Sequence, residues 1–478
     1  MSNIVWRPQP KQKLFLERPE FEVLYGGAAG GGKSDAAVMI PLSQVHIPHF
    51  KALILRKTYP QLTELIDKSL NYYKSAFPDA KYNDSKHRWT FPSGATVAFG
   101  SMNHRKDREN YRGKQYDVII FDELTHFTWD EYSFMFSRCR PSGPGTRCFI
   151  RSTTNPGGVG HGWVKDKFIS CAPPMTRIVT RRTISGADGK PIVTERDRMF
   201  IPARVYDNQA LLMNDPDYIA NLAMLPEKER KAQLEGSWDS FEGQVFMEWR
   251  NNPVHYDDQI FTHVISPFDI PSWWRIYRGF DWGFSKPFAV GWFAVDEEER
   301  IYLFREYYGS NGVPDTGLCM QKEEVARNIH RIEQEDPRLR GKNIIGIADP
   351  AIFASDGGIS IADTMEKQGV LFERGSHERI PGKMEFHRRL AFGTDGRPMF
   401  YCFNTCRNFI RTIPTLVYSE SDVEDVDTKQ EDHIYDMARY VFMSNPCPAR
   451  KTVDPPAVSD DDPLDLREKP DRYSFYRI

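Results

Sequence analysis

Long apolar runs are absent from this sequence of 478 residues. No stretch approaches the ~20 consecutive apolar residues that a membrane-spanning helix requires, so the sequence predicts no contact with a membrane. The first residues, MSNIVWRPQPKQ, also lack the apolar core of a secretory signal peptide. We therefore expect a protein that is neither exported nor inserted into a membrane.

Cysteine and net charge are both low. The seven cysteines are scattered, and Cys402 and Cys406 form the only close pair, without a second pair to complete a zinc site. Reduced thiols in a cytosolic setting are the simplest interpretation. The formal net charge is −3, so any surface that binds nucleic acid must be local, or its contact with DNA must be transient.

Glycine, in contrast, is concentrated in one place. The stretch YGGAAGGGKSDAA, from Tyr25 to Ala37, contains five glycines, and such a run costs backbone entropy in a structured element. A flexible linker is one interpretation. However, an apolar strand-like run (21–27) precedes the glycines and a helix-forming run (34–44) follows them. A strand, a glycine loop and the start of a helix are the context that a phosphate-binding loop requires.

The spacing within this loop supports the same interpretation. Gly27, Gly32, Lys33 and Ser34 match the pattern G-x-x-x-x-G-K-[ST], in which backbone N–H groups surround phosphates at the start of a helix. We expect Lys33 to contact the outer phosphates of ATP and the Ser34 hydroxyl to hold Mg²⁺.

Two adjacent acids follow an apolar run. Residues 116–127, YDVIIFDELTHF, are almost wholly apolar up to Asp122 and Glu123, as expected for a parallel strand covered on both faces. Residues 52–59 are expected to form another such strand. Asp122 would hold Mg²⁺ beside Ser34, and Glu123 would polarise the water that attacks the γ-phosphate. Two acids that merely cap a strand end are the plainer alternative.

A further strand is predicted within residues 147–156, and it ends in four short polar residues, Ser152 to Asn155. Thr154 and Asn155 are expected to lie beside the γ-phosphate and to sense its loss, although an ordinary polar turn would look the same. Near the N-terminus, Gln12 is expected to read the edge of the adenine through its amide. That signal is weak by itself.

The second half places acids at the ends of apolar segments. Residues 273–308 read as a meander of three strands, with Asp281 inside the apolar segment RGFDWG, where a charge is costly unless it is paired or bound to a metal. Residues 342–350, KNIIGIADP, end on Asp349. The segment EDHIYDMARYVF (431–442) is predicted to be helical.

That helix carries Asp432 and Asp436 on one face, four residues apart, with His433 between them. Acids on a first strand, on a later parallel strand and on a late helix are typical of two-metal nucleases. Hard oxygen ligands suit Mg²⁺ or Mn²⁺ better than zinc. Each acid alone has a plainer interpretation as a turn, a cap or a surface residue.

A series of motifs, in this order, resembles those of one family, the large terminase subunits of tailed bacteriophages. They are LYGGAAGGGKSD, LILRKTYPQL, YRGKQYDVIIFDELTHF, STTNPGG, GFDWGFSKPFA, GIADP and DHIYDMARY. Members of that family are ATP-driven motors that package double-stranded DNA into the procapsid and cut the DNA concatemer. The resemblance extends from about Trp6 to Phe442.

The resemblance implies an α/β protein with an additional-strand, RecA-like P-loop ATPase domain followed by a ribonuclease H-like nuclease domain. It implies an ATPase core over residues 1–195, a helical lid or linker over 196–250 and a nuclease over 251–444. Residues 445–478 are rich in Pro and Asp, and we expect a tail that is disordered in isolation.

The resemblance also implies roles for the acids of the second half. Asp281, Asp349 and Asp436 fall on the family's nuclease triad, which works with two Mg²⁺ or Mn²⁺ ions. Asp432 and His433 are neighbours whose roles vary within the family. Glu306, in LFREYY, is expected as an additional metal ligand.

One departure concerns arginine. Many members of the family carry an arginine early in the phosphate loop, and GGAAGG has none. A charge from elsewhere must then stabilise the transition state of ATP hydrolysis. Arg112 resembles a residue that some members insert into the neighbouring subunit, and Arg56 is the second candidate. A simple surface arginine is the alternative for Arg112.

The partners implied by the resemblance are double-stranded DNA, the portal protein and the small terminase subunit. It further implies a homo-oligomeric ring, a pentamer in the family, that docks transiently on the procapsid in the host bacterial cytoplasm and is absent from the mature virion. A helicase or translocase whose second half only binds nucleic acid is the rival interpretation. A structural capsid-associated protein with an inert phosphate loop is the third.

Overall fold

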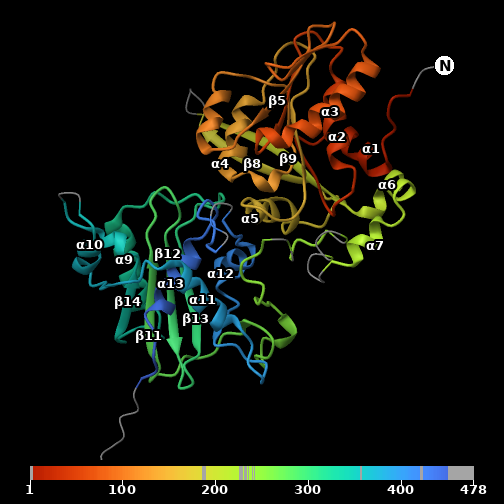
Figure 1. Ribbon diagram of the computed structural model, residues 1–478. Coiled ribbons are helices and arrows are strands. Elements are labelled where there is room, and N and C mark those ends of the chain that lie inside the picture. Colours follow the sequence, from red (N-terminus) through yellow and green to blue (C-terminus); the bar gives the residue numbers. More distant parts are fainter. Residues whose placement is uncertain are drawn as a thin grey trace, which may run out of the picture.

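The computed structural model describes residues 4–449 except 186–189, 226–229, 231–233, 235, 240, 242, 356–357, 420–421 and 423. Two α/β lobes follow one another along the chain (Figure 1). The N-terminal lobe, up to residue 241, is built on a sheet of nine strands, and the C-terminal lobe, from residue 243, on a sheet of seven. Within these described ranges no helix combines the length and the apolar character needed to span a membrane.

The sheet of the N-terminal lobe has the strand order β3-β4-β5-β2-β6-β7-β1-β9-β8. Six neighbouring strands, from β5 to β9 in this order, run parallel, whereas the pairs β3–β4, β4–β5 and β8–β9 are antiparallel. The strands are β1 (Glu22–Gly27), β2 (Lys51–Arg56), β3 (Lys81–Asn83), β4 (Arg88–Thr90), β5 (Thr96–Ser101), β6 (Val118–Phe121), β7 (Phe149–Thr154), β8 (Ile178–Ser185) and β9 (Pro191–Ala203).

Strand β7 lies between β1, which leads into the glycine loop, and β6, which leads into Asp122. This inserted strand is the additional strand that the resemblance implied. Since parallel strands end at the same edge of a sheet, the order of these three strands brings the loop, the acids and the end of β7 together.

Helices cover both faces of this sheet, as the apolar strands require. Side chains of α2 and α3 pack with Val23, Tyr25 and Ile54 in one core, whereas side chains of α4 and α5 pack with Leu24 and Leu53 in another. The alternation along each strand therefore divides the interior into two layers. The helices of this lobe are α1 (Pro10–Glu17), α2 (Lys33–Met39), α3 (Tyr59–Ala76), α4 (Trp129–Phe134), α5 (His161–Val164), α6 (Gln209–Asn214) and α7 (Tyr218–Ala223).

The sheet of the C-terminal lobe has the order β10-β16-β13-β12-β11-β14-β15. Strands β11, β12 and β13 form an antiparallel meander, and β14 runs parallel to β11. The strands are β10 (Val264–Ile265), β11 (Arg275–Asp281), β12 (Ala289–Val295), β13 (Ile301–Tyr308), β14 (Ile344–Ala348), β15 (Glu373–Arg374) and β16 (Phe400–Phe403). The meander and the parallel strand beside it are the ribonuclease H-like arrangement, so the predicted fold class is confirmed for both lobes.

Helix α13 packs directly on the centre of this sheet (Figure 1). The contact is close because β11 and β12 present Gly279 and Gly291 to it. A Cβ atom at Gly279 would lie 2.5 Å from the Met437 carbonyl oxygen. The helices of this lobe are α9 (Lys322–Glu335), α10 (Ile361–Lys367), α11 (Arg379–Leu390), α12 (Arg407–Thr412) and α13 (His433–Met443).

Two expected boundaries are corrected. Residues 196–203, expected in a helical lid, belong to β9, which pairs with β1 from Glu22↔Arg198 to Gly27↔Ala203. Val245, Phe246 and Trp249, expected in the linker, are part of the C-terminal core. The remaining division into domains stays a prediction, and the tail beyond residue 449 lies outside the described residues.

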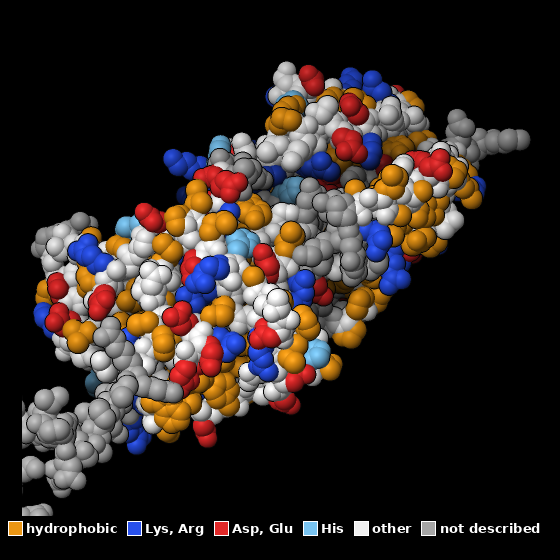
Figure 2. Space-filling view, turned by 60° about the horizontal axis from the view of Figure 1, so that its bottom comes forward, with side chains coloured by type: hydrophobic (Ala, Val, Ile, Leu, Met, Phe, Trp, Pro, Cys, Tyr) orange, Lys and Arg blue, Asp and Glu red, His pale blue; other side chains and the backbone are white. Residues whose placement is uncertain are grey.

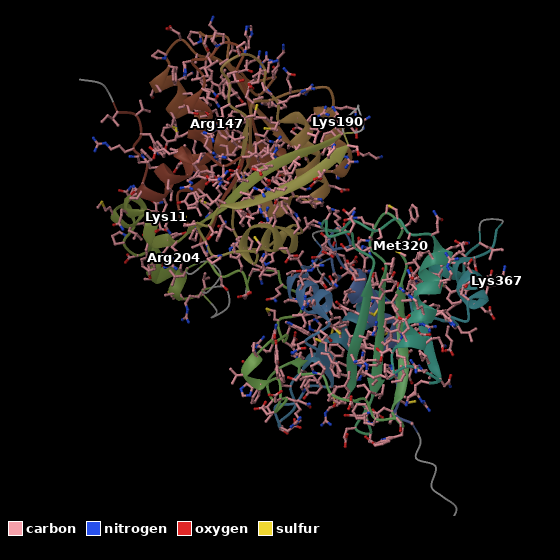
Figure 3. The ribbon with its side chains drawn as sticks, turned by 180° about the vertical axis from the view of Figure 1, so that it is seen from behind. Lys11, Arg147, Lys190, Arg204, Met320 and Lys367 are labelled. Atoms are coloured by element: carbon pink, nitrogen blue, oxygen red, sulfur yellow. The ribbon has the colours of Figure 1, made fainter. Side chains whose placement is uncertain are left out.

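The segment after β9 covers the glycine loop. Asn208 Nδ2 donates to the Gly30 carbonyl oxygen at 2.7 Å, and side chains of Leu211 in α6 and Tyr218 in α7 lie against Gly30. Lys11 of α1 binds the same segment through Asp207, and Figure 3 shows Lys11 and Arg204 at this end of the lobe. These short helices therefore occupy the place of a lid.

The lobes meet through polar contacts. Arg411 of α12 donates to Asp166 of the N-terminal lobe at 2.9 Å, and a cavity of about 290 Å³ lies between the lobes. On the face in Figure 2, acidic and basic side chains are interspersed, in keeping with the small net charge.

The close approach of α13 to the sheet gives a first prediction. Gly279→Ala places a methyl group against the backbone of α13, and such overpacking typically costs about 1–3 kcal/mol. We expect a lower midpoint for thermal unfolding of the C-terminal lobe, measured by circular dichroism. Gly358→Ala is the control, because no described heavy atom lies within 4 Å of a Cβ built there. Equal midpoints for the two variants would contradict the packing described here.

Candidate functional sites

The glycine loop is shaped so that only glycine fits its critical positions. Gly27 and Gly32 have φ angles of 134° and 69°, in the left-handed region that side chains disfavour. A Cβ atom at Gly27 would also lie 2.5 Å from the Ala203 carbonyl oxygen of β9. The loop is therefore a cradle of bare backbone that opens at the start of α2, as a phosphate site requires.

Lys33 is the first residue of α2 and is buried. Its Nζ donates to the Ala28 carbonyl oxygen at 2.5 Å, within the loop itself. Burial lowers the pKa of Lys33, while the charges of Glu123 and Asp122 oppose that shift. Among the residues that the structure describes, a loop carbonyl is the one hydrogen-bond partner of this buried ammonium, which is therefore well suited to receive an anionic ligand.

Asp122 and Glu123 follow β6 at the same edge of the sheet. Asp122 is fully buried, and its Oδ2 accepts from Arg56 Nε at 2.7 Å and from Ser34 Oγ at 3.4 Å. Thr153 of β7 donates to Oδ1 of the same carboxylate. Ser34 and Asp122 thus offer adjacent hard oxygen atoms, which fit the Mg²⁺ of a bound nucleotide.

Glu123 and the end of β7 are joined directly. The backbone N–H and the side-chain amide of Asn155 donate to the two carboxylate oxygens of Glu123 at 3.0 and 3.2 Å. Glu123 has a φ of 55°, a strained conformation for a non-glycine residue that is common at functional sites. Thr154 Oγ1 lies 2.8 Å from Thr125 Oγ1 in the same turn. The predicted phosphate sensor therefore contacts the predicted base.

The Asn155 side chain also has a polar atom that forms no hydrogen bond with the described residues. This atom is Oδ1, and it is buried. Since such an atom is costly, a ligand or ordered water beside Glu123 fits this position.

Gln12 lies against the glycine loop. Its Nε2 donates to the Gly32 carbonyl oxygen at 2.7 Å, and its Oε1 accepts from the Gln9 backbone N–H. The oxygen and one amide proton are thus engaged within the protein. Recognition of adenine by Gln12 stays a prediction.

The two candidate arginines occupy different environments. Arg112 follows a short helical turn, its side chain is 71% exposed, and its Nε lies 2.6 Å from Glu109 Oε2. Arg56 ends β2 and pairs with Asp122. Arg112 is therefore placed to reach another molecule, and Arg56 already touches the acids of its own chain.

The three acids of the C-terminal lobe converge at one end of its sheet. Asp281 ends β11, Asp349 follows the neighbouring strand β14, and Asp436 lies one turn into α13, which covers both strands. The carboxylates of all three raise the pKa of the Tyr440 phenol after the larger effect of burial, so all three lie near one side chain. Burial raises the pKa of Asp281 to about 6, and the charges of Asp436 and Asp349 act in the same direction.

Cations from the protein itself neutralise part of this cluster. Asp436 Oδ1 accepts from Arg439 Nε at 2.9 Å, and Arg379 Nη1 lies 3.3 Å from Asp436 Oδ2. Asp349 Oδ1 accepts the Ala351 backbone N–H at 2.9 Å. Among the described residues no three acids, histidines or cysteines are already gathered closely enough to hold a metal ion. The carboxylate oxygens are nevertheless the kind of ligand that Mg²⁺ and Mn²⁺ prefer. A bound ion would replace Arg379 beside Asp436.

Asp432 and His433 belong to the same cluster. Asp432 is buried, and burial together with the charge of Asp436 raises its pKa well above the usual value. His433 Nδ1 lies 3.1 Å from Asp281 Oδ2. Burial alone would lower the pKa of His433, but the hydrogen bond and charge of Asp281 outweigh it and the pKa is raised.

The structure shows another use for Glu306. Its carboxylate accepts three hydrogen bonds at the start of α12, from the Asn408 backbone N–H, the Asn408 amide and the Phe409 backbone N–H, at 2.7, 2.8 and 3.0 Å. Glu306 therefore caps α12, and its role as a metal ligand stays a prediction.

Sequence reasoning missed several side chains that hold these acids. They are Arg379, Arg439, Asp315 and, as a direct partner of Asp122, Thr153. Arg439 had a local signal, since it lies three residues after Asp436 on a predicted helix. Arg379 and Asp315 come from distant loops and helix ends, and no spacing in the sequence identifies them.

A comparison with known protein families gives one match to this chain. Residues 24–250 match the family model described as "Terminase large subunit, T4likevirus-type, N-terminal". No curated protein sequence matches the chain.

Three solved structures illustrate the structural similarity. A large terminase from a thermophilic bacteriophage is 16% identical with a TM-score of 0.38, over 92% of this chain and 99% of that one. The large terminase of bacteriophage HK97 is 10% identical with a TM-score of 0.44, over 92% and 95%. The nuclease domain of the P22 large terminase is 16% identical with a TM-score of 0.32, over 44% and 95%. At these values the structures add nothing to what the two sheets already establish about the fold.

The contacts of Glu306 with α12 give a second prediction. Glu306→Ala should leave binding of Mn²⁺ unchanged and lower the thermal unfolding midpoint, because donors at the start of α12 lose their acceptor, at a cost of about 1–3 kcal/mol. Isothermal titration calorimetry and thermal unfolding measure the two effects. The control is Glu298→Ala, since that side chain is 63% exposed. Loss of Mn²⁺ binding in Glu306→Ala would support the metal role.

Proposed function

Because the chain belongs, through residues 24–250, to the family of large terminase subunits, we propose that it is the motor subunit of a viral DNA-packaging machine. In this proposal the N-terminal lobe hydrolyses ATP to translocate double-stranded DNA into a procapsid. The C-terminal lobe is a metal-dependent endonuclease that cuts the concatemer. The contact of Asn155 with Glu123, beside Asp122 and the glycine loop, is the observation that carries the proposal.

The chemistry of the N-terminal lobe follows from charge and position. Lys33 would exchange its loop carbonyl for phosphate oxygens, and Ser34 with Asp122 would hold Mg²⁺. Glu123 would orient the attacking water, and Asn155 would detect the change when the γ-phosphate leaves, because it binds the same carboxylate. Movement of β7 would then report hydrolysis to the rest of the lobe.

The chemistry of the C-terminal lobe requires divalent metal. Two Mg²⁺ or Mn²⁺ ions would supply Lewis-acid stabilisation of the phosphodiester and an activated water. Asp281, Asp349 and Asp436 would hold the ions, with Asp432 as a neighbouring acid. Because these residues act on phosphate, which every DNA sequence shares, we expect little sequence preference in cutting.

We further propose the partners that the resemblance implies. These are DNA, the portal, the small terminase subunit and copies of the same chain in a ring, in the bacterial cytoplasm and on the procapsid. The rival function, a translocase without a nuclease, predicts ATP hydrolysis with no divalent affinity at Asp281 or Asp349. A structural protein would show no ATP hydrolysis at all.

The first test concerns ATP. Lys33→Ala should abolish nucleotide binding, because Lys33 contacts the phosphates of the ground state. Glu123→Gln should bind ATP and turn it over about 10²–10⁴-fold more slowly, the usual contribution of general base catalysis. Fluorescent nucleotide titration and phosphate release measure the two steps. Turnover of Glu123→Gln within a few-fold of the native protein would show that Glu123 is not the base.

The second test concerns the arginine. If Arg112 acts on the neighbouring subunit, an inactive Arg112→Ala protein mixed with inactive Lys33→Ala protein should regain ATPase activity, since each supplies what the other lacks. Arg181→Ala is the matched control, because Arg181 is also exposed and lies 2.6 Å from a glutamate. No rescue, together with turnover per subunit that does not depend on concentration, would assign the role to Arg56 in the same chain.

The third test concerns cutting. Asp281→Ala and Asp349→Ala should each abolish nicking of plasmid DNA with Mn²⁺ and leave ATP hydrolysis unchanged, because the two sites lie in separate lobes. His433→Ala should weaken nicking less, and Ca²⁺ should bind without supporting it. Asp395→Ala, a change in an exposed turn, is the control. Full nicking by either aspartate variant would remove the nuclease assignment and favour the translocase.

A further inference from the structure

The loop between β13 and α9 brings an unexpected acid to the C-terminal site. Asp315 lies in this loop, residues 309–321, and has a φ of 50°, in the left-handed region that disfavours a side chain. Such strain persists only where the surroundings hold it, and it concentrates at functional sites. Two side chains hold Asp315: it forms an ion pair with Lys286 and accepts from His433.

His433 connects this loop to Asp281. Its Nε2 lies 3.2 Å from Asp315 Oδ1, and its Nδ1 lies 3.1 Å from Asp281 Oδ2. Both partners are carboxyl groups, so a ring with a proton on each nitrogen donates to both of them. The imidazole is largely buried and is fixed from both sides.

The arrangement leaves half of the Asp281 carboxylate free. The contact with His433 is the one hydrogen bond found to its side chain among the described residues, and it uses Oδ2. Oδ1 of this buried group therefore remains available for a ligand. Fixing one oxygen through a histidine reduces the rotation of the carboxylate and prepares the other oxygen for a ligand.

We propose that Asp315 is a positioning residue of the nuclease site: it orients His433, which in turn orients the metal-binding carboxylate of Asp281. This inference rests on the proposed nuclease function. Partners that orient metal ligands typically contribute about 10–100-fold to metal affinity. Asp315 contacts neither the metal nor DNA in this account.

The loop that carries Asp315 also borders the other lobe. Gly312, Val313 and Pro314, just before it, line a hollow together with Trp129 and other side chains of the N-terminal lobe. Met320, near the end of the same loop, lies at the end of the C-terminal lobe that faces the N-terminal lobe (Figure 3). The loop that carries Asp315 thus lies at the boundary between the two lobes.

The test measures Mn²⁺ affinity of the full chain without nucleotide, by electron paramagnetic resonance of free Mn²⁺. We expect Asp315→Ala to weaken binding about 10–100-fold. Asp315→Asn keeps an acceptor for His433 Nε2 and should retain much of the affinity. Asp258→Ala is the matched control, because Asp258 Oδ2 also lies 2.9 Å from a histidine nitrogen, that of His255.

A second comparison separates positioning from a merely structural role. In protein that already carries His433→Ala, the further change Asp315→Ala should alter affinity by no more than about twofold, since its effect passes through the imidazole. ATP hydrolysis should stay at the native rate in every variant. If Asp315→Ala weakens Mn²⁺ binding about 10–100-fold even in protein that carries His433→Ala, the inference is overturned.

The variant Asp281→Ala shows whether a negative result overturns the positioning role of Asp315 or the nuclease assignment itself. If Asp281→Ala binds Mn²⁺ as tightly as the native protein, the proposed site is wrong. If Asp281→Ala loses binding and Asp315→Ala keeps it within about twofold, the site stands and only the positioning role of Asp315 is overturned.

Discussion

Both sites of this protein depend on pairing between a buried carboxylate and a basic side chain. Asp122 is paired with Arg56 at 2.7 Å, and Asp436 with Arg439 at 2.9 Å. Asp281 has His433 at 3.1 Å. An unpaired charge would be expensive at such depth, so each acid is retained with a partner. Because a buried ion pair adds little net stability, the retention of the arginine pairs is better explained by a ligand that can take the place of an arginine.

The sheets explain why the acids are where they are. In each lobe a carboxylate lies at the carboxyl end of a central strand, with a second polar segment at the end of the neighbouring strand: β6 with β7, and β11 with β14. Parallel neighbours end at the same edge, so residues far apart in sequence meet there without a long loop. The glycines of β11 and β12 serve the same end, because they let α13 bring Asp436 down onto the sheet.

Much of this was predictable, since apolar strands that end on acids and a helix with acids four residues apart are local patterns. The glycine loop, the strand ends at Asp122, Asp281 and Asp349, and the helix of Asp436 lie where the sequence predicted them. What sequence could not provide are contacts between distant segments. Glu306 was expected as a ligand from the resemblance alone, and no sequence pattern shows its contact with the start of α12. Residues 196–203 looked like a linker, but β9 completes the first sheet. Arg379 reaches Asp436, and Asp315 reaches His433, only through the fold.

The central claim is that divalent ions bind among these carboxylates and displace Arg379 from Asp436, while His433 stays on Asp281. Anomalous X-ray diffraction at the manganese edge, on crystals grown with Mn²⁺ and a non-hydrolysable ATP analogue, tests it directly. The account predicts one peak between Ser34 and Asp122 beside the phosphates. It predicts two more peaks among Asp281, Asp349 and Asp436, with Arg379 displaced from Asp436. Crystals that contain the nucleotide but show no anomalous peak at the three aspartates, with Arg379 still paired to Asp436, would contradict it.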